Sequence, residues 1–157
     1  RIKEIICMGD TLVHKYPVED TSVALARFQN GAIGIIDSCF SIPDNSSKNI
    51  LEIYGSKGSV IAMGTIGQSP DGTATAYLET STKGYDAQQT RQITSTSTKI
   101  EVKPYNTYRA QIENFSSSVL EDKDVLNSGE DGVRNQALVI AAYKSIKTKK
   151  VEKVLIK

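Results

Sequence analysis

The spacing of apolar residues changes near Pro104 of this 157-residue chain, and that change constrains the fold more than any other feature. Up to about residue 102 the apolar residues form short runs that end at glycine, proline, asparagine or serine, which is typical of β-strands. After Pro104 they recur every three or four residues, which is typical of helices. Strands followed by helices predict an α+β domain.

Seven runs in the first part of the chain predict strands, and an eighth follows the helical part. Asn30-Gly31 separates the second and third runs and is a strong signal for a tight hairpin. Glycines at 55 and 58 predict a second tight turn. We expect the strands at residues 2–7, 23–28, 32–40, 49–54, 59–63, 73–80, 88–102 and 151–156.

Two helices are predicted in the last third of the chain. Asn106 or Thr107 can cap the first, whose apolar stripe contains Tyr108, Ile112, Phe115 and Val119. Ser128 can cap the second, and Asp131 three residues later completes a loose capping box.

These elements predict an open, mostly antiparallel β-sheet with two C-terminal helices on one face. The strands carry apolar residues on both sides, and two helices can cover only one of them. A large exposed apolar sheet is a liability in a monomer. We therefore expect the other face to be available for oligomerisation, as a homodimer or tetramer.

The composition excludes several classes of partner. The chain has 19 basic and 18 acidic residues, a net charge of +1, so we expect no nucleic-acid partner. No apolar run approaches the roughly 20 residues of a membrane span, so we expect no membrane partner. Cys7 and Cys39 could form a disulfide, but two buried thiols in a cytoplasmic protein are the simpler interpretation. The chain starts at Arg1 rather than at a methionine, so we expect a piece of a longer protein.

The sequence contains few candidates for catalysis. His14 is the only histidine and could act as a general base, but a solvated loop imidazole is the simpler interpretation. Glu19 and Asp20 could act as paired carboxylates, but solvated charge and turn chemistry are the simpler interpretation. There is no GxSxG and no GxGxxG motif, and one histidine with two distant cysteines does not make a zinc site. We therefore predict no catalytic, cofactor-binding or metal-binding residue in this chain.

One cluster could hold a polar ligand. Tyr105 and Tyr108 lie beside Asn106 and close to Arg109, at the start of the first predicted helix. Tyr108 also begins the apolar stripe, so a place in the core is an equally good interpretation of that residue. We take Tyr108, Tyr105 and Arg109 as candidate substrate-binding residues.

Several short motifs occur in a characteristic order between Val18 and Ile156. They are Val18–Thr21 before Ala24–Ala32, then Leu51–Ser59, then Tyr108 with Phe115, then Ser128–Gly132 and Ala141–Ser145. In order and spacing they resemble the C-terminal domain of the Gfo/Idh/MocA oxidoreductases. The loop at 44–48 lacks the aromatic residues of the family's inositol enzymes, so the resemblance leaves the substrate open.

The resemblance implies an NAD(P)-dependent oxidoreductase of two domains that acts on a sugar, a polyol or a related hydroxy compound. Its Rossmann domain, which is absent from this chain, would bind NAD or NADP and carry the catalytic lysine. Residues 1–157 would form the C-terminal substrate and oligomerisation domain, with part of the substrate pocket and the dimer interface. The resemblance also places Tyr108 at a position where some relatives contact substrate, and implies that the chain is inactive alone.

Two other functions remain open from the residues. One is a stand-alone β-rich module that binds a ligand or a protein without catalysis. The other is a small hydrolase that uses His14 with Asp20. A dinucleotide-binding segment upstream in the reading frame would favour the oxidoreductase.

Overall fold

The computed structural model describes residues 1–80 and 95–156. The chain forms two compact units, which we describe separately. The first unit contains Arg1–Asp44 and Lys123–Lys157, and the second contains Asn45–Asp122. A 3₁₀ turn, η1, spans Asp44–Ser46.

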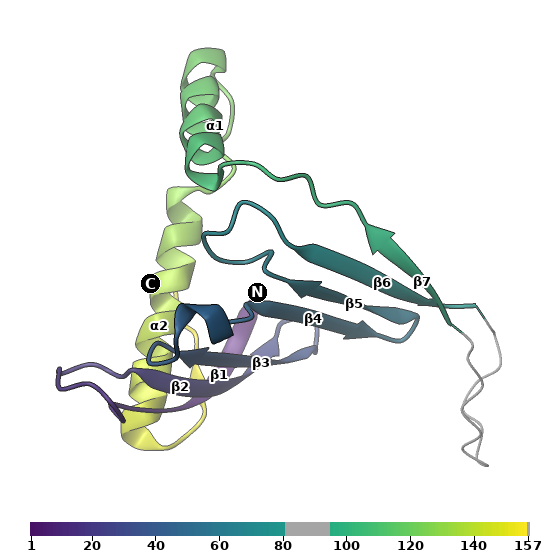
Figure 1. Ribbon diagram of the computed structural model, residues 1–157. Helices are drawn as coiled ribbons and strands as arrows, with labels where there is room; N and C mark the ends of the chain where they lie inside the picture. Colours follow the sequence, from purple (N-terminus) through teal and green to yellow (C-terminus); the bar gives the residue numbers. More distant parts are fainter. Residues whose placement is uncertain (81–94, 157) are drawn as a thin grey trace, which may run out of the picture. The chain divides into compact units, whose positions relative to one another are not determined.

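In the first unit β3, β2 and β1 lie side by side (Figure 1), and β8 pairs with β1 to complete a four-stranded sheet in the order β3-β2-β1-β8. All its neighbouring strands are antiparallel. The strands are β1 (Ile2–Asp10), β2 (Thr21–Phe28), β3 (Ile33–Cys39) and β8 (Glu152–Lys153). The last strand is shorter than the predicted 151–156, although the amide of Val154 still donates to the carbonyl of Lys3 at 3.0 Å.

The Asn30-Gly31 hairpin joins β2 to β3, as predicted. Gly31 has φ of 90°, which favours glycine. Its amide donates to the carbonyl of Phe28 at 3.0 Å, and the amide of Phe28 donates to the carbonyl of Ala32 at 2.8 Å. This turn sets the register of β2 against β3 and therefore decides which side chains share a face.

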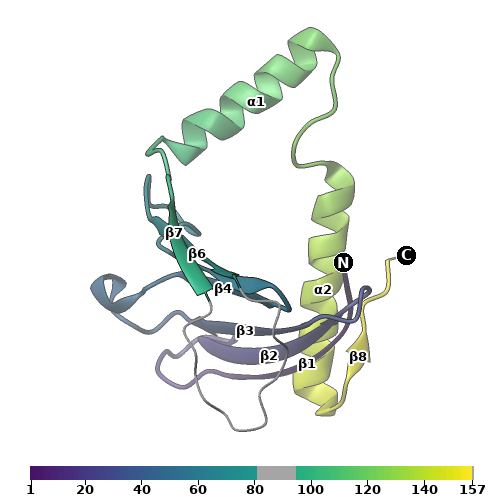
Figure 2. The same ribbon diagram turned by 90° about the vertical axis from the view of Figure 1, so that its right-hand side faces the viewer.

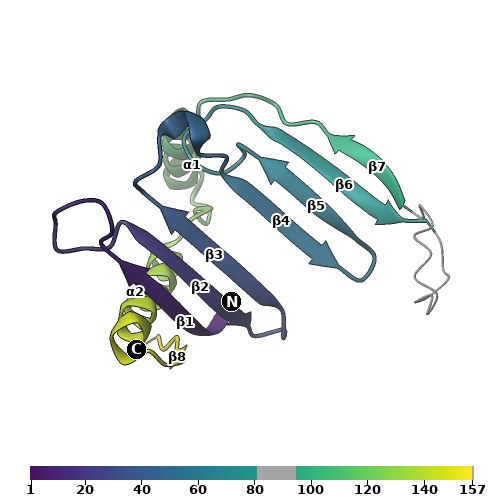
Figure 3. The same cartoon turned by 60° about the horizontal axis from the view of Figure 1, so that its bottom comes forward.

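The second unit contains a four-stranded antiparallel sheet in sequence order (Figure 3). Its strands are β4 (Ile50–Gly55), β5 (Gly58–Met63), β6 (Thr73–Glu79) and β7 (Ser95–Ile100). Gly58 has φ of 143°, and a Cβ there would lie 2.1 Å from the carbonyl oxygen of Tyr77. The predicted strand 88–102 corresponds to β7, and its residues 88–94 lie outside the described residues.

The α+β class and the open antiparallel sheets are confirmed, with the strands divided between two sheets rather than joined in one. Helix α2 (Gly129–Thr148) crosses one face of the first sheet (Figure 2). Ile5, Cys7, Ala24 and Ala141 form the buried core between them. The predicted capping box of Ser128 and Asp131 is present at the start of α2.

Helix α1 (Thr107–Glu121) belongs to the second unit. Of its two predicted caps, Asn106 is the one used, and its side-chain oxygen accepts from the amide of Arg109 at 3.0 Å. The apolar stripe of α1 faces solvent, because each of its four members is between 56% and 67% exposed: Tyr108, Ile112, Phe115 and Val119.

The face of the first sheet that lies opposite α2 is also uncovered. Side chains alternate along each strand, so the residues between the buried Ile5, Cys7, Ala24 and Ala26 point away from the helix. We call this surface the open face; its apolar members are Ile6, Met8, Val23, Leu25, Ile33 and Ile35. All of them except the half-buried Ile6 are exposed, and Met8 reaches 79%.

Among the described residues, no helix is long and apolar enough to span a membrane.

Candidate functional site

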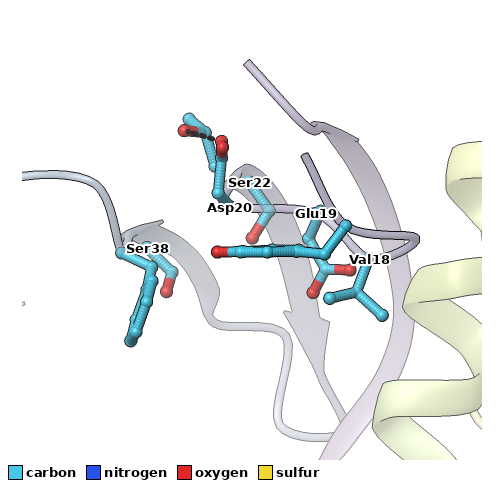
Figure 4. A pocket seen from close by; sticks show the side chains of 8 residues that line it. Val18, Glu19, Asp20, Ser22 and Ser38 are labelled. Carbon is cyan, nitrogen blue, oxygen red and sulfur yellow. Dashed lines mark hydrogen bonds between the residues drawn. The ribbon is translucent and has the colours of Figure 1, made fainter. Parts of the chain in front are cut away.

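A pocket of about 540 Å³ lies at one end of the first sheet (Figure 4). The loop between β1 and β2 and the ends of β2 and β3 form its walls. The lining residues are Tyr16, Val18, Glu19, Asp20, Thr21, Ser22, Ser38 and Phe40. The lining offers hydroxyl groups, two carboxylates and two aromatic rings but no basic side chain, so it suits a neutral or cationic polar group better than an anion.

Asp20 holds the β1–β2 loop in place. Its residue is only 3% exposed. Its carboxylate accepts from the amides of Leu12, Val13 and His14 at 3.0, 2.8 and 2.9 Å, and from the Thr21 hydroxyl at 3.0 Å. These hydrogen bonds, led by that from the His14 amide, hold the pKa of the carboxyl well below its usual range. The interpretation of Asp20 as solvated charge is therefore wrong, whereas its role in turn chemistry is confirmed.

The structure does not assemble a catalytic pair from His14 and Asp20. Asp20 binds the backbone amide of His14 rather than its ring. The imidazole instead stacks on Tyr16, with ring centroids 5.1 Å apart and planes 12° apart. It also lies 6.0 Å from the ring of Phe40. His14 thus belongs to an aromatic group with Tyr16 on the same loop and Phe40 just after β3, and the hydrolase hypothesis loses its geometric basis.

The Asp20→Asn substitution is expected to lower stability at pH 7, because an amide offers one acceptor oxygen and turns a donor toward the loop amides. We expect a loss of roughly 5 °C in Tm. Because the folded pKa is depressed, this stabilisation is present above the ordinary carboxyl pKa of about 4 and is lost as the pH falls below it. The difference between wild type and variant should therefore shrink in acid.

Thermal and urea unfolding at pH 7 and pH 3 would check this expectation. The exposed Asp71 provides a matched control, as Asp71→Asn makes the same chemical change on the surface. A gap between wild type and Asp20→Asn that stayed constant over this pH range would contradict the assigned role.

Glu19 contributes a second carboxylate to the pocket, and this one has fewer hydrogen-bond partners than that of Asp20. It is half-buried, and its Oε2 atom is enclosed without a hydrogen-bond partner among the described residues. Its carboxylate is the main cause of the raised pKa of Tyr143, followed by burial. Burial is the main cause of the raised pKa of Cys7, and Glu19 adds to it. This wall of the pocket is therefore anionic.

The predicted substrate-binding cluster lies in the other unit. Tyr105 and Tyr108 are 61% and 56% exposed at the start of α1. The Arg109 Nε donates to Glu113 Oε1 at 2.6 Å, one turn along the helix. These three residues share one region of the second unit, and none of them lines the pocket.

The two thiols are free, with Cys7 buried and Cys39 half-buried. Cys39 Sγ lies 3.7 Å from the Thr21 hydroxyl. Over residues 1–80 and 95–156 no group of three potential metal-ligating side chains comes together.

Comparison with known proteins identifies the fold over almost the whole chain. The family described as "Oxidoreductase family, C-terminal alpha/beta domain" (GFO_IDH_MocA_C) matches residues 2–155. No curated protein sequence matches the chain.

Solved structures share this fold at low sequence identity. An oxidoreductase domain protein from Kribbella flavida aligns with a TM-score of 0.77 and 20% identity, over 99% of this chain and 45% of its own. An aldose-aldose oxidoreductase from Caulobacter crescentus, complexed with glycerol, gives 0.74 and 18%, over 97% and 41%. The WlbA dehydrogenase from Bordetella pertussis, in complex with NADH and UDP-GlcNAcA, gives 0.68 and 18%, over 99% and 40%. The chain thus spans less than half the length of each of these structures.

Proposed function

Because this chain belongs to the Gfo/Idh/MocA oxidoreductase family, whose C-terminal alpha/beta domain it matches over residues 2–155, we propose that it works as the C-terminal domain of an NAD(P)-dependent oxidoreductase. The substrate would be a sugar, a polyol or a related hydroxy compound. The domain would contribute part of the substrate pocket and the subunit interface. The family match is the observation that carries this proposal.

The length comparison supports a parent protein with a separate cofactor domain. The solved relatives are more than twice as long as the matched region, and the WlbA dehydrogenase structure contains NADH. This chain has no GxGxxG motif of its own. A Rossmann domain would therefore hold NAD or NADP, and hydride transfer would take place between that cofactor and the bound substrate.

The exposed apolar stripe of α1 also supports a parent protein with a separate cofactor domain. Four large side chains along one side of a helix are costly to leave in water. Tyr105, Tyr108 and Arg109 lie at the start of this helix, where a phenol hydroxyl and a guanidinium could bind substrate hydroxyl groups. We assign these three residues to the substrate side of the parent enzyme.

The open face of the first sheet supports self-association as a homodimer or tetramer. It groups six apolar side chains on one side of a sheet whose other side is already covered by α2. Free thiols at Cys7 and Cys39 are consistent with a cytoplasmic location.

The test compares this 157-residue chain with the product of the complete reading frame that contains it. We expect the complete product to reduce NAD or NADP with a sugar or polyol, and the 157-residue chain to give no turnover. A spectrophotometric assay of NAD(P)H formation over a panel of such substrates would check both. Turnover by the 157-residue chain alone, or a reading frame without a dinucleotide-binding segment, would overturn the proposal.

The same assay tests the substrate side. In the complete product, Tyr108→Ala is expected to raise KM about tenfold, the effect of losing roughly 1.4 kcal/mol of substrate binding. Tyr54→Ala, which removes an exposed tyrosine from β4, is the matched control. An unchanged KM in the Tyr108 variant would remove that residue from the site.

A further inference from the structure

The pocket at the end of the first sheet combines negative charge with aromatic rings. Its lining residues include two acidic side chains and two aromatic rings but no basic side chain. They come from the β1–β2 loop, the start of β2 and the end of β3, so all of them belong to the first unit (Figure 4). A volume of about 540 Å³ is within the range of small-molecule pockets. The charge of the walls favours a cation as the ligand.

Backbone hydrogen bonds fix the shape of the pocket. Ser22 and Ser38 lie opposite each other in the register of β2 and β3, so two small polar side chains line the pocket at that point. The amide of Phe40 donates to the carbonyl of Asp20 at 2.8 Å, which holds the aromatic residue beside the acidic one. The walls are therefore formed before any ligand arrives.

The carboxylate of Asp20 is ionised but has no oxygen left for a hydrogen-bonding ligand. Its Oδ1 accepts from the Leu12 amide and the Thr21 hydroxyl, and its Oδ2 accepts from the amides of Val13 and His14. A carboxylate has about four acceptor positions, so this one is fully occupied. It acts on a ligand through its negative charge rather than through a hydrogen bond.

Glu19 adds a negative charge with little compensation. Its Oε2 is enclosed and has no hydrogen-bond partner among the described residues, and its carboxylate accepts from the Tyr143 hydroxyl. An enclosed carboxylate oxygen without a partner is unfavourable. A cation a few ångströms away would offset that cost without entering a hydrogen bond.

Tyr16 and Phe40 provide the aromatic surface. Both rings contact the imidazole of His14, which stacks on Tyr16 and lies 6.0 Å from Phe40 at a tilt of 59°. Phe40 is 77% exposed, so much of its ring is open to a ligand. The faces of aromatic rings attract cations, and quaternary ammonium groups are recognised in this way.

We propose that this pocket binds an alkylated ammonium group, such as the trimethylammonium group of choline, against the rings of Tyr16 and Phe40 and close to the charges of Glu19 and Asp20. Such a group has no N–H donor, so it matches a pocket in which the oxygens of Asp20 are already occupied. This binding goes beyond the proposed oxidoreductase function and does not depend on it.

The first test compares two ligands of the same shape on the 157-residue chain by isothermal titration calorimetry. One is choline, and the other is its carbon isostere, a neutral alcohol with a tert-butyl group in place of the trimethylammonium group. We expect choline to bind at least about tenfold more tightly, because only choline carries the charge. Equal affinities, or no saturable binding of choline, would overturn the proposal.

The second test locates the site by substitution. Glu19→Gln removes a charge at almost constant shape, and Phe40→Leu removes an exposed ring; each is expected to weaken choline binding about fivefold. Glu52→Gln and Tyr54→Leu make comparable changes at exposed positions of β4 and should leave the affinity unchanged.

A wild-type affinity for choline in either pocket variant would show that this pocket is not the site. Circular dichroism would confirm folding, and Glu19→Ala or Tyr16→Leu would replace a variant that unfolds. The measurement needs neither NAD(P) nor a sugar, so its failure would leave the proposed function in place, and failure of the oxidoreductase assay would leave choline binding in place.

Discussion

The Leu25→Asp variant is expected to be monomeric where the wild-type chain associates. Leu25 lies in the middle of the open face, on β2 between Ile6 of β1 and Ile35 of β3, and is 50% exposed in the single chain. Its replacement should therefore leave folding largely intact, because the side chain already points to solvent. In a dimer the same position would bury an unpaired carboxylate, which is strongly unfavourable. We expect the dissociation constant to rise at least about 100-fold, corresponding to roughly 2.7 kcal/mol.

Light scattering after size-exclusion chromatography would measure this effect. Leu120→Asp is the matched control, since it places the same charge on an even more exposed leucine of α1. The control should keep the wild-type mass. A Leu25→Asp chain with unchanged mass and concentration dependence would show that the open face is not the interface.

Among the substitutions that do not act through the subunit interface, Ser145→Ala is expected to cause the largest loss of stability. Ser145 is fully buried on α2. Its Oγ accepts from the Cys7 amide at 2.8 Å and donates to the carbonyl of Lys150 at 2.7 Å, so one hydroxyl links β1, α2 and the turn toward β8. Alanine would leave the buried Cys7 amide without a partner, at a cost of about 1–3 kcal/mol, and would remove the hydrogen bond to the part-buried carbonyl of Lys150. We expect a total loss of roughly 2–4 kcal/mol and a fall in Tm of about 5–15 °C.

Urea unfolding followed by circular dichroism would measure this loss. Gln136→Ala is the control, because it removes an exposed polar side chain from the same helix. Its effect should stay within about 0.5 kcal/mol. A Ser145→Ala chain as stable as this control would contradict the linking role of the hydroxyl.

The sequence predicted the local features that depend on few neighbouring residues. The turn at Gly31, the cap at Asn106 and the capping box of Ser128 with Asp131 all form as expected. Each of them depends on hydrogen bonds or backbone angles within about four residues, so the residue types alone are informative.

Features that depend on distant contacts were harder to predict. The burial of Asp20 requires the β1–β2 loop to fold back over the carboxylate. Its only sequence signal is an aspartate at the end of a polar loop, which most often indicates solvent exposure. The division of the strands into two sheets was likewise not predicted, because it lies between β3 and β4, which follow one another in sequence but do not pair.

The candidate site was predicted only in part. Tyr105, Tyr108 and Arg109 were named from their clustering and from the family resemblance, and their role stays a prediction. The apolar residues on both sides of the strands were enough to predict an uncovered sheet face. The charged residues on that face could be located only from the register of β1 against β2 and β3. That register depends on turn geometry and core packing together.

The most direct test of the account is the mass of the unmodified chain in solution. Sedimentation equilibrium over a range of concentrations should give twice or four times the 17.1 kDa chain mass, with dissociation on dilution. A mass of 17.1 kDa at every concentration, up to the solubility limit, would show that the apolar sheet surface is stable in water without a second copy and would contradict the account.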